Sequence, residues 1–275
     1  MTIFRRRDSG LLPLDGWHAR PGGEGLIMAI DVDPADPAAA AAELIVAVDS
    51  ATERLRQTAA GLSDQQAREP SRLPGWSRGH VLTHVARNAD SLRNLLIWAR
   101  TGIVTPQYAD QSERERGIAA GAGRPPAELL ADLDASAAAL AAEAASLRAD
   151  QWAAEVRGLH GAPHAAWFTL QRRRIEVEVH HVDLDAGYSP DEWPLDFAAT
   201  LLESVVADFA DAEAPAARLR IAETGSPLRI GPPDATTTVE ISGPARALLA
   251  WLIGRSSGAG LAAAPPGPLP ALPPW

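Results

Sequence analysis

The segment from His164 to Asp185 constrains the fold more than any other part of the chain, because it is apolar on two sides and polar in between. Projected on a helix at about 100° per residue, its large apolar side chains form two separate stripes. The stripes consist of Phe168, Ile175, Val179 and Val182 on one side and of Leu170, Val177 and Leu184 on the other. A helix of this kind is expected inside a helical bundle, with the polar seam between the stripes pointing inward.

The seam itself consists of Thr169, Arg173, Glu176, His180 and Asp183. The remaining side of the segment carries Arg174, Glu178, His181 and Asp185, and we expect it to be an ordinary solvent-exposed face. One alternative stays open at this stage, since the run Val-Glu-Val-Glu-Val alternates residue by residue as a strand would. We favour the helix because the run lies within a longer helical segment.

Three further segments have helical patterns, and together with the first they predict a four-helix bundle. They run from Pro37 to Gly61, from Ser77 to Arg100 and from Pro126 to Leu147. Ser77 is a suitable N-cap for the second of them. Over residues 105–123 we expect a linker that is longer than most connections between adjacent helices. Such a crossover is typical of a bundle that is not a simple series of hairpins.

Beyond residue 190 the pattern changes to short segments separated by Gly and Pro. We expect two helices here, Leu195–Ala210 and Pro244–Ile253. We expect strands at Leu219–Ile221, Leu228–Ile230 and Thr236–Ile241. The predicted fold class is therefore mainly α, with a bundle over residues 28–190 followed by a small α+β domain over residues 191–263. Residues 1–27 are expected to be an extension, with Met28 as an alternative start, and residues 264–275 a disordered Pro-rich tail.

Composition excludes several kinds of partner and site. The net charge of −10 argues against nucleic acid or an anionic membrane surface as a partner. No segment is apolar enough for a signal peptide or a membrane span, which predicts a cytoplasmic protein. The chain has no cysteine, so any thiol chemistry must use a thiol from outside it. The oligomeric state is left open, with a monomer favoured.

Three residues form a candidate metal site. His84 falls close to the apolar stripe of its helix, although a buried histidine taken alone is more often a hydrogen-bonded core residue than a ligand. Glu176 and His180 are four residues apart, so they share one helix face and can reach the same ion. With His84 they form the two-histidine, one-carboxylate set of catalytic zinc sites, which leaves a position open for water or a thiol. The competing interpretation is that Glu176 only pairs with Arg172 or Arg173.

Several short motifs are specific enough to indicate a family. They are LPGWSRGH at residues 73–80, HVARNAD at residues 84–90, EVEVHHVDL at residues 176–184, GYSP at residues 187–190 and WP at residues 193–194. Through them the chain resembles the mycothiol-dependent maleylpyruvate isomerases over roughly residues 30–260. The resemblance implies a DinB-like four-helix bundle followed by a small C-terminal domain.

The resemblance also implies a set of site residues and cofactors. A zinc ion, or another divalent metal, would be held by a His, Glu and His set that falls here on His84, Glu176 and His180. An arginine of the C-terminal domain would act in catalysis, and we place it at Arg255 in preference to its neighbour Arg246. The implied partners are mycothiol, a low-molecular-weight thiol, and a small-molecule substrate.

The implied activity is the isomerisation of maleylpyruvate to fumarylpyruvate, a step of the gentisate pathway of aromatic catabolism. A thiolate would add to the cis double bond, allow rotation about the resulting single bond, and leave again. The metal would hold the thiolate, and Arg255 would bind a substrate carboxylate. Two alternatives remain: a mycothiol S-transferase that acts on electrophiles, and a non-catalytic metal-binding protein with a DinB-like bundle.

Overall fold

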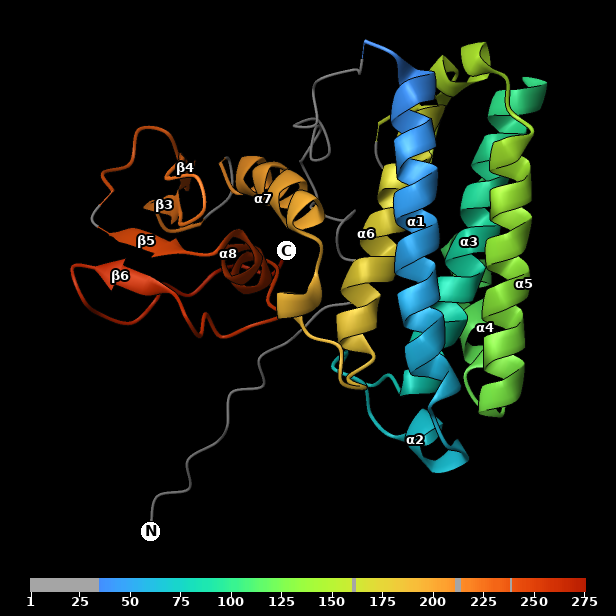
Figure 1. Cartoon of the computed structure of the whole chain (residues 1–275), viewed down its shortest axis with the longest axis horizontal. Coiled ribbons are helices and arrows are strands. Elements are labelled where there is room, and N and C mark those ends of the chain that lie inside the picture. Colours follow the sequence, from blue (N-terminus) through green and yellow to red (C-terminus); the bar gives the residue numbers. More distant parts are fainter. Residues whose placement is uncertain (1–34, 160–161, 211–213, 238) are drawn as a thin grey trace.

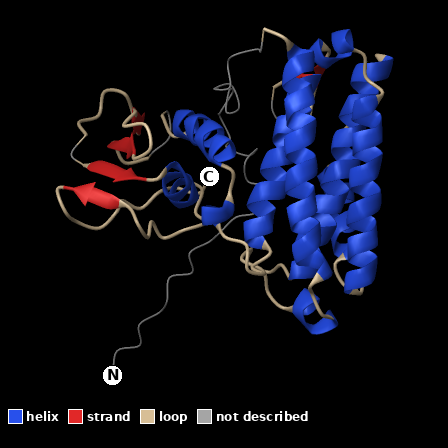
Figure 2. Cartoon of the chain, in the orientation of Figure 1, coloured by secondary structure: helices blue, strands red, loops and turns tan. Residues whose placement is uncertain are grey.

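The structure is a computed structural model that describes residues 35–159, 162–210, 214–237 and 239–275. These residues form two parts that lie side by side, a bundle of long helices and a smaller domain with a sheet (Figure 1). Figure 2 shows most of the strands in the smaller part. The predicted fold class, a helical bundle followed by a small α+β domain, is confirmed. The expected extension over residues 1–27, and Met28, lie outside the described residues.

Four long helices form the bundle: α1 (Pro37–Ala60), α3 (Arg78–Thr101), α5 (Pro126–Ala145) and α6 (Ala166–Asp183). Helix α3 packs against α5 and α6, and α1 packs against α6 and α5. Local sequence fixes both ends of α3. Ser77 and His80 form a capping box at its start, and Gly102 ends it in the left-handed conformation. In the part of the chain that is described, no helix is long and apolar enough to cross a membrane.

The segment expected to be a linker contains a helix, α4 (Gln111–Gly121), so that expectation was wrong. Asp110 caps this helix by accepting a hydrogen bond from the backbone nitrogen of Glu113 at 2.8 Å. Helix α4 packs against α3, and its buried residues include one large apolar side chain, Ile118. A helix with so few apolar residues has no clear amphipathic pattern, which is why the sequence did not reveal it.

Short elements complete the bundle. Helix α2 (Asp64–Arg68) precedes α3, and the 3-10 helix η2 (Ala149–Ala153) follows α5. Strands β1 (Glu155–Val156) and β2 (His164–Ala165) pair antiparallel just before α6. The helix that we expected from His164 therefore begins two residues later, at Ala166.

The C-terminal domain consists of η3 (Pro190–Glu192), α7 (Leu195–Asp208), β3 (Ala217–Ile221), β4 (Pro227–Ile230), β5 (Glu240–Gly243), α8 (Ala245–Leu252) and β6 (Ala262–Ala264). The sheet has the order β4-β3-β5-β6, in which β3 and β5 are parallel and the other pairs are antiparallel. Residues of β3 are alternately buried and exposed, as expected for a sheet with one face on a core. Helices α7 and α8 pack against each other beside it.

The Pro-rich tail is packed, so the expectation that residues 264–275 are disordered was wrong. Leu269, Leu272 and Trp275 pack against the core of the C-terminal domain. The indole nitrogen of Trp275 donates a hydrogen bond to Asp208 at 3.1 Å. Proline disfavours regular structure, but it does not prevent a chain from burying the apolar side chains that lie between the prolines.

Helix α6 belongs to both parts of the molecule. Ile175, Val179 and Val182, from one of its apolar stripes, lie in the core of the C-terminal domain. Leu170 and Val177, from the other stripe, lie in cores of the bundle. The first stripe is therefore covered largely by the second domain, whereas the sequence indicated burial inside the bundle.

Candidate metal centre

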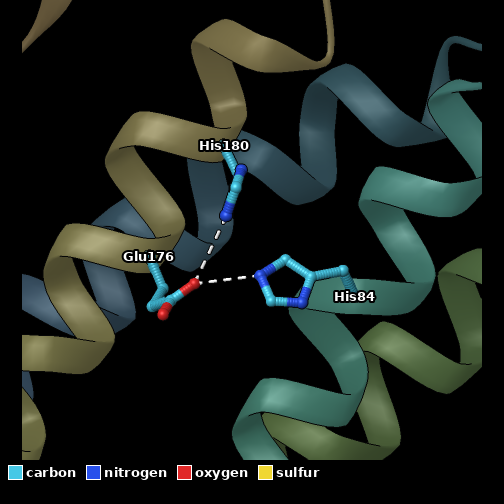
Figure 3. A group of neighbouring side chains, drawn as sticks. All are labelled: His84, Glu176 and His180. Carbon is cyan, nitrogen blue, oxygen red and sulfur yellow. Dashed lines mark hydrogen bonds and ion pairs between the residues drawn. The ribbon is translucent and has the colours of Figure 1, made fainter. Parts of the chain in front are cut away.

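Three predicted ligands converge between α3 and α6. Glu176 and His180 lie one turn apart on α6, and His84 faces them from α3 (Figure 3). Glu176 Oε2 is 3.0 Å from His84 Nε2 and 3.3 Å from His180 Nε2. One potential ligand atom from each of the three residues lies within 4.8 Å of the others. The interpretation in which Glu176 only pairs with a neighbouring arginine does not fit this arrangement.

The hydrogen bonding of His180 fits a metal ligand. Its Nδ1 lies 3.0 Å from Asp183 Oδ2, so one ring nitrogen is held by a carboxylate. Its Nε2 is buried and has no hydrogen-bond partner of suitable geometry among the described residues. Metal-bound histidines commonly use one nitrogen for the ion and give the other to a carboxylate, which fixes the orientation of the ring. Two imidazoles and one carboxylate are also a donor set that zinc accepts.

The charges of the three residues suit a cation. Burial opposes charge on Glu176, but the close contacts with the imidazoles of His180 and His84 outweigh it and hold the pKa of the carboxyl well below its usual value. Burial also opposes the imidazolium of His180, yet Asp183 and Glu176 raise the pKa of this ring to about 9. The pKa of His84 is lowered, first by burial and then by the charge of His180. An incoming metal ion would therefore release a proton from His180.

Asp183 connects the metal centre to Arg255 of the C-terminal domain. Arg255 Nε donates to Asp183 Oδ1 at 3.0 Å, and Nη2 donates to Oδ2 at 2.8 Å. The remaining nitrogen, Nη1, donates to the carbonyl oxygen of Ile253 at 2.8 Å. The structure thus places Arg255 on the carboxylate that holds His180. Direct contact of Arg255 with a substrate stays a prediction. Asp183 lay in the polar seam, and its position three residues after His180 was the signal for its role.

Two family models match the chain. The model described as the mycothiol maleylpyruvate isomerase N-terminal domain matches residues 48–185, and the MDMPI C-terminal domain matches residues 192–274. The chain belongs to the mycothiol maleylpyruvate isomerase family. The C-terminal family model includes most of the Pro-rich tail, in agreement with its packing in the structure.

This member of the family is similar to a solved structure over most of its length. The crystal structure of the mycothiol-dependent maleylpyruvate isomerase matches with 26% identity and a TM-score of 0.79, covering 90% of this chain and 99% of that chain. A crystal structure of a histidine-to-alanine mutant of that isomerase matches equally well. No match was found among curated proteins.

Two arginines beside the centre were not predicted from the sequence to be site residues. Arg114 comes from α4, the helix that the sequence did not reveal, and its Nη2 lies 3.2 Å from His84 Nδ1. Arg173 is buried on α6, and its Nη1 donates to the carbonyl of Val85 at 2.7 Å and to Asn88 Oδ1 at 2.8 Å. Burial lowers the pKa of Arg173 to about 10. Two cationic side chains thus lie beside the centre.

The face of α6 that carries Glu178 is buried, so the expectation of a solvated face was wrong for three of its four residues. Arg174, Glu178 and His181 are buried, whereas Asp185 is exposed. The carboxylate of Glu178 accepts hydrogen bonds from Arg54 of α1 and from the hydroxyl of Tyr188, and its backbone carbonyl accepts one from the indole of Trp193. The ring of His181 stacks on that of Tyr188, with 3.7 Å between centroids, and its Nε2 lies 2.7 Å from Thr58 Oγ1. Helix α1 and the segment that follows α6 cover this face.

Proposed function

We propose that this chain converts maleylpyruvate to fumarylpyruvate with mycothiol as its thiol cofactor, at a zinc site held by His84, Glu176 and His180. The observation that carries the proposal is the convergence of two imidazoles and one carboxylate, whose ligand atoms lie within 4.8 Å of one another. The family of the chain supports the same function, because the chain belongs to the mycothiol maleylpyruvate isomerase family and resembles a crystal structure of such an isomerase.

The reaction requires the cis double bond of the substrate to become single for a short time. The thiolate sulfur forms a bond to one alkene carbon, and the electron pair of the double bond moves towards the conjugated carbonyl. After rotation about the new single bond, the electron pair returns, the carbon–sulfur bond breaks, and the thiolate leaves the trans product. When bound, zinc supplies Lewis acidity that keeps the thiol ionised at neutral pH.

The residues of the chain have separate parts in this proposal. His84, Glu176 and His180 bind the metal, and Asp183 orients His180 through its Nδ1. Arg255 acts as a positioning residue, because its guanidinium neutralises Asp183 and fixes the carboxylate in a bidentate contact. The C-terminal domain would thereby take part in the reaction without contributing a metal ligand.

The test is the conversion of maleylpyruvate by the full-length, zinc-loaded protein with and without mycothiol, followed by NMR of the two alkene protons. We expect conversion only when both mycothiol and the metal are present, and none by the His84→Ala variant. Consumption of mycothiol and an alkylating electrophile without isomerisation would support an S-transferase instead. If neither reaction occurred, the chain would be better described as a metal-binding protein.

A further inference from the structure

Arg172 is a buried cation next to the proposed metal centre, and its donors have no partner among the residues that the structure describes. It lies on α6 four residues before Glu176, so the two side chains share one face of the helix. The residue is only 6% exposed. Among the described residues, none accepts a hydrogen bond from its guanidinium or forms an ion pair with it. A charged group in this position calls for a counter-ion.

Each of the neighbouring buried arginines makes at least one hydrogen bond or ion pair. Arg174 pairs with Asp196 at 2.7 Å, and Arg255 pairs with Asp183 at 2.8 Å. Arg173 donates from Nη1 to two oxygens of α3, although its Nε and Nη2, like Nε of Arg174, are buried without a hydrogen-bond partner among the described residues. Arginine is rarely buried without a partner, because an unpaired buried charge lowers the stability of the folded state. The stability that Arg172 costs is therefore expected to serve ligand binding.

No carboxylate among the described residues forms an ion pair with Arg172. Glu176 is the carboxylate whose charge acts on Arg172, but its Oε2 faces the two histidines at 3.0 and 3.3 Å. A metal ion would draw on the same carboxylate. Burial lowers the pKa of Arg172, with Glu176 and Tyr108 acting in the opposite direction, and a guanidinium stays charged at neutral pH in spite of such a shift. The charge of Arg172 is thus available to an anion from solution.

The guanidinium of Arg172 and the side-chain amide of Gln107 both lie close to the backbone of Gly158. A Cβ atom at residue 158 would lie 2.6 Å from Arg172 Nη1 and 2.8 Å from Gln107 Oε1, so a larger residue there would force these two side chains to shift. Gln107 is fixed in turn, because its Oε1 accepts a hydrogen bond from the backbone of Leu159 at 2.9 Å and its Nε2 donates to Ser91 at 3.3 Å. A cation that is positioned but not neutralised is what a preformed anion site requires.

We propose that Arg172 binds a carboxylate of the substrate and makes the site selective for unsaturated carboxylates over neutral electrophiles. The inference rests on the proposed function for the reaction itself, whereas binding of a carboxylate needs no thiol. The planar fork of a guanidinium matches a carboxylate in bidentate contact. Because Arg172 and Glu176 are separated by one helical turn, a small substrate bound to Arg172 lies beside the metal centre. Three of the five N–H groups of Arg255 already donate to Asp183 and Ile253, whereas no described residue accepts a hydrogen bond from Arg172.

The first experiment measures the binding of maleate, a cis dicarboxylate, to the full-length zinc-loaded protein by calorimetry in the absence of any thiol. Arg172→Gln should raise the Kd at least about tenfold, the effect of losing a charge-assisted hydrogen bond, and Arg172→Lys should lie in between. Arg174→Gln is the matched control, because it removes a partnered buried charge from the other side of the same helix. It should change the Kd less than about twofold.

A second variant keeps the charge and moves it. Gly158→Ala should displace the flexible end of Arg172, because the new methyl group would overlap with Nη1, and maleate binding should weaken while metal content stays the same. Without maleate, Arg172→Gln should melt no lower than the wild type, since it removes an unpaired buried charge. Unchanged maleate affinity in both variants, a wild-type chain that does not bind maleate, or a large drop in the melting temperature of Arg172→Gln would each overturn the inference.

The same measurements separate this inference from the proposed function. A wild-type chain that binds maleate through Arg172 but does not isomerise maleylpyruvate would overturn the proposed function alone. A chain that isomerises maleylpyruvate, but binds maleate equally well with Gln at residue 172, would overturn the role of Arg172 alone.

Discussion

Two faces of helix α6 bury polar side chains, one around Glu176 and the other around Glu178. On the Glu178 face the carboxylate binds Arg54 and a tyrosine hydroxyl, so its charge is matched within the chain. On the Glu176 face two histidine nitrogens converge on one carboxylate oxygen, and Arg172 beside them has no partner among the described residues. The two carboxylates are two residues apart, and the side chain of Glu176 is 13% exposed whereas that of Glu178 is 1% exposed. What distinguishes them is convergence and unused bonding capacity, which indicate a ligand where burial alone would not.

The sharpest test of this comparison is metal content, because a ligand removed from the Glu176 face should abolish tight binding altogether. We expect His84→Ala and His180→Ala to lose the metal, since two remaining ligands hold a divalent ion poorly. His181→Ala should retain it, because His181 faces Thr58 and Tyr188 on the other side of the helix. Metal analysis of the purified variants gives the answer. Loss of metal in His181→Ala, with the fold intact, would contradict the separation of the two faces.

The connection from Arg255 to the Glu176 face should give the next largest effect. Arg255→Ala leaves Asp183 buried without its cation, which typically costs about 3–5 kcal/mol of unfolding free energy. Because Asp183 also holds His180, metal affinity should fall by roughly ten- to a hundredfold. Urea unfolding and competition with a chelator measure the two effects. Arg255→Lys should recover only part of either.

Arg246→Ala is the control for this experiment, since Arg246 is the neighbouring arginine that the sequence left as an alternative. It should change neither stability nor metal affinity appreciably. If Arg255→Ala impaired turnover while metal affinity and stability stayed at the wild-type level, direct contact with the substrate would replace the positioning role. A silent Arg255→Ala beside an impaired Arg246→Ala would move the role to Arg246.

The smallest predicted effect belongs to the Glu178 face and concerns pH. Burial, together with the charge of Arg54, lowers the pKa of His181 to about 3. In the unfolded chain a histidine titrates near pH 6.5, so between these values the unfolded state binds a proton that the folded state does not. Stability should therefore fall as the pH falls below about 6.5, by up to about 1.4 kcal/mol per pH unit from this residue.

His181→Phe isolates this contribution, because phenylalanine can stack on Tyr188 but cannot titrate. Its unfolding free energy, measured in urea between pH 6.5 and pH 4.5 on metal-free protein, should depend less steeply on pH than that of the wild type. The loss of the contact with Thr58 lowers stability at every pH, so the slope and not the level is the quantity to compare. Parallel curves for the two proteins would show that His181 is not held neutral.

The sequence was informative where the signal is local. The period of the apolar residues predicted the four long helices, and the helical wheel selected Glu176 and His180 in preference to Glu178 and His181 as the pair that meets His84. These predictions need only the geometry of one helix, because side chains four residues apart must share a face. The structure brings the selected three together.

Other features depend on contacts between distant segments and could not be predicted in this way. The side of α6 with Glu178 is polar in sequence, and only the packing of α1 and Tyr188 against it makes it buried. The Pro-rich tail has few large apolar residues, but Trp275 packs against a core that is formed by other elements of the C-terminal domain. The same holds for Arg172, because a sequence does not show whether an arginine has a partner.

Because α6 supplies two ligands of the candidate metal centre and also part of the core of the C-terminal domain, the molecule cannot be divided into two independent folding units. A chain cut after residue 190 would keep the three ligands but expose Ile175, Val179 and Val182 to water, and it would lose the cation that faces Asp183. Such a fragment would be prone to aggregate, and its His180 ring would be less well oriented. The intact chain is therefore expected to unfold in a single cooperative transition, and a metal ion bound in the bundle should raise the melting temperature of the sheet domain as well.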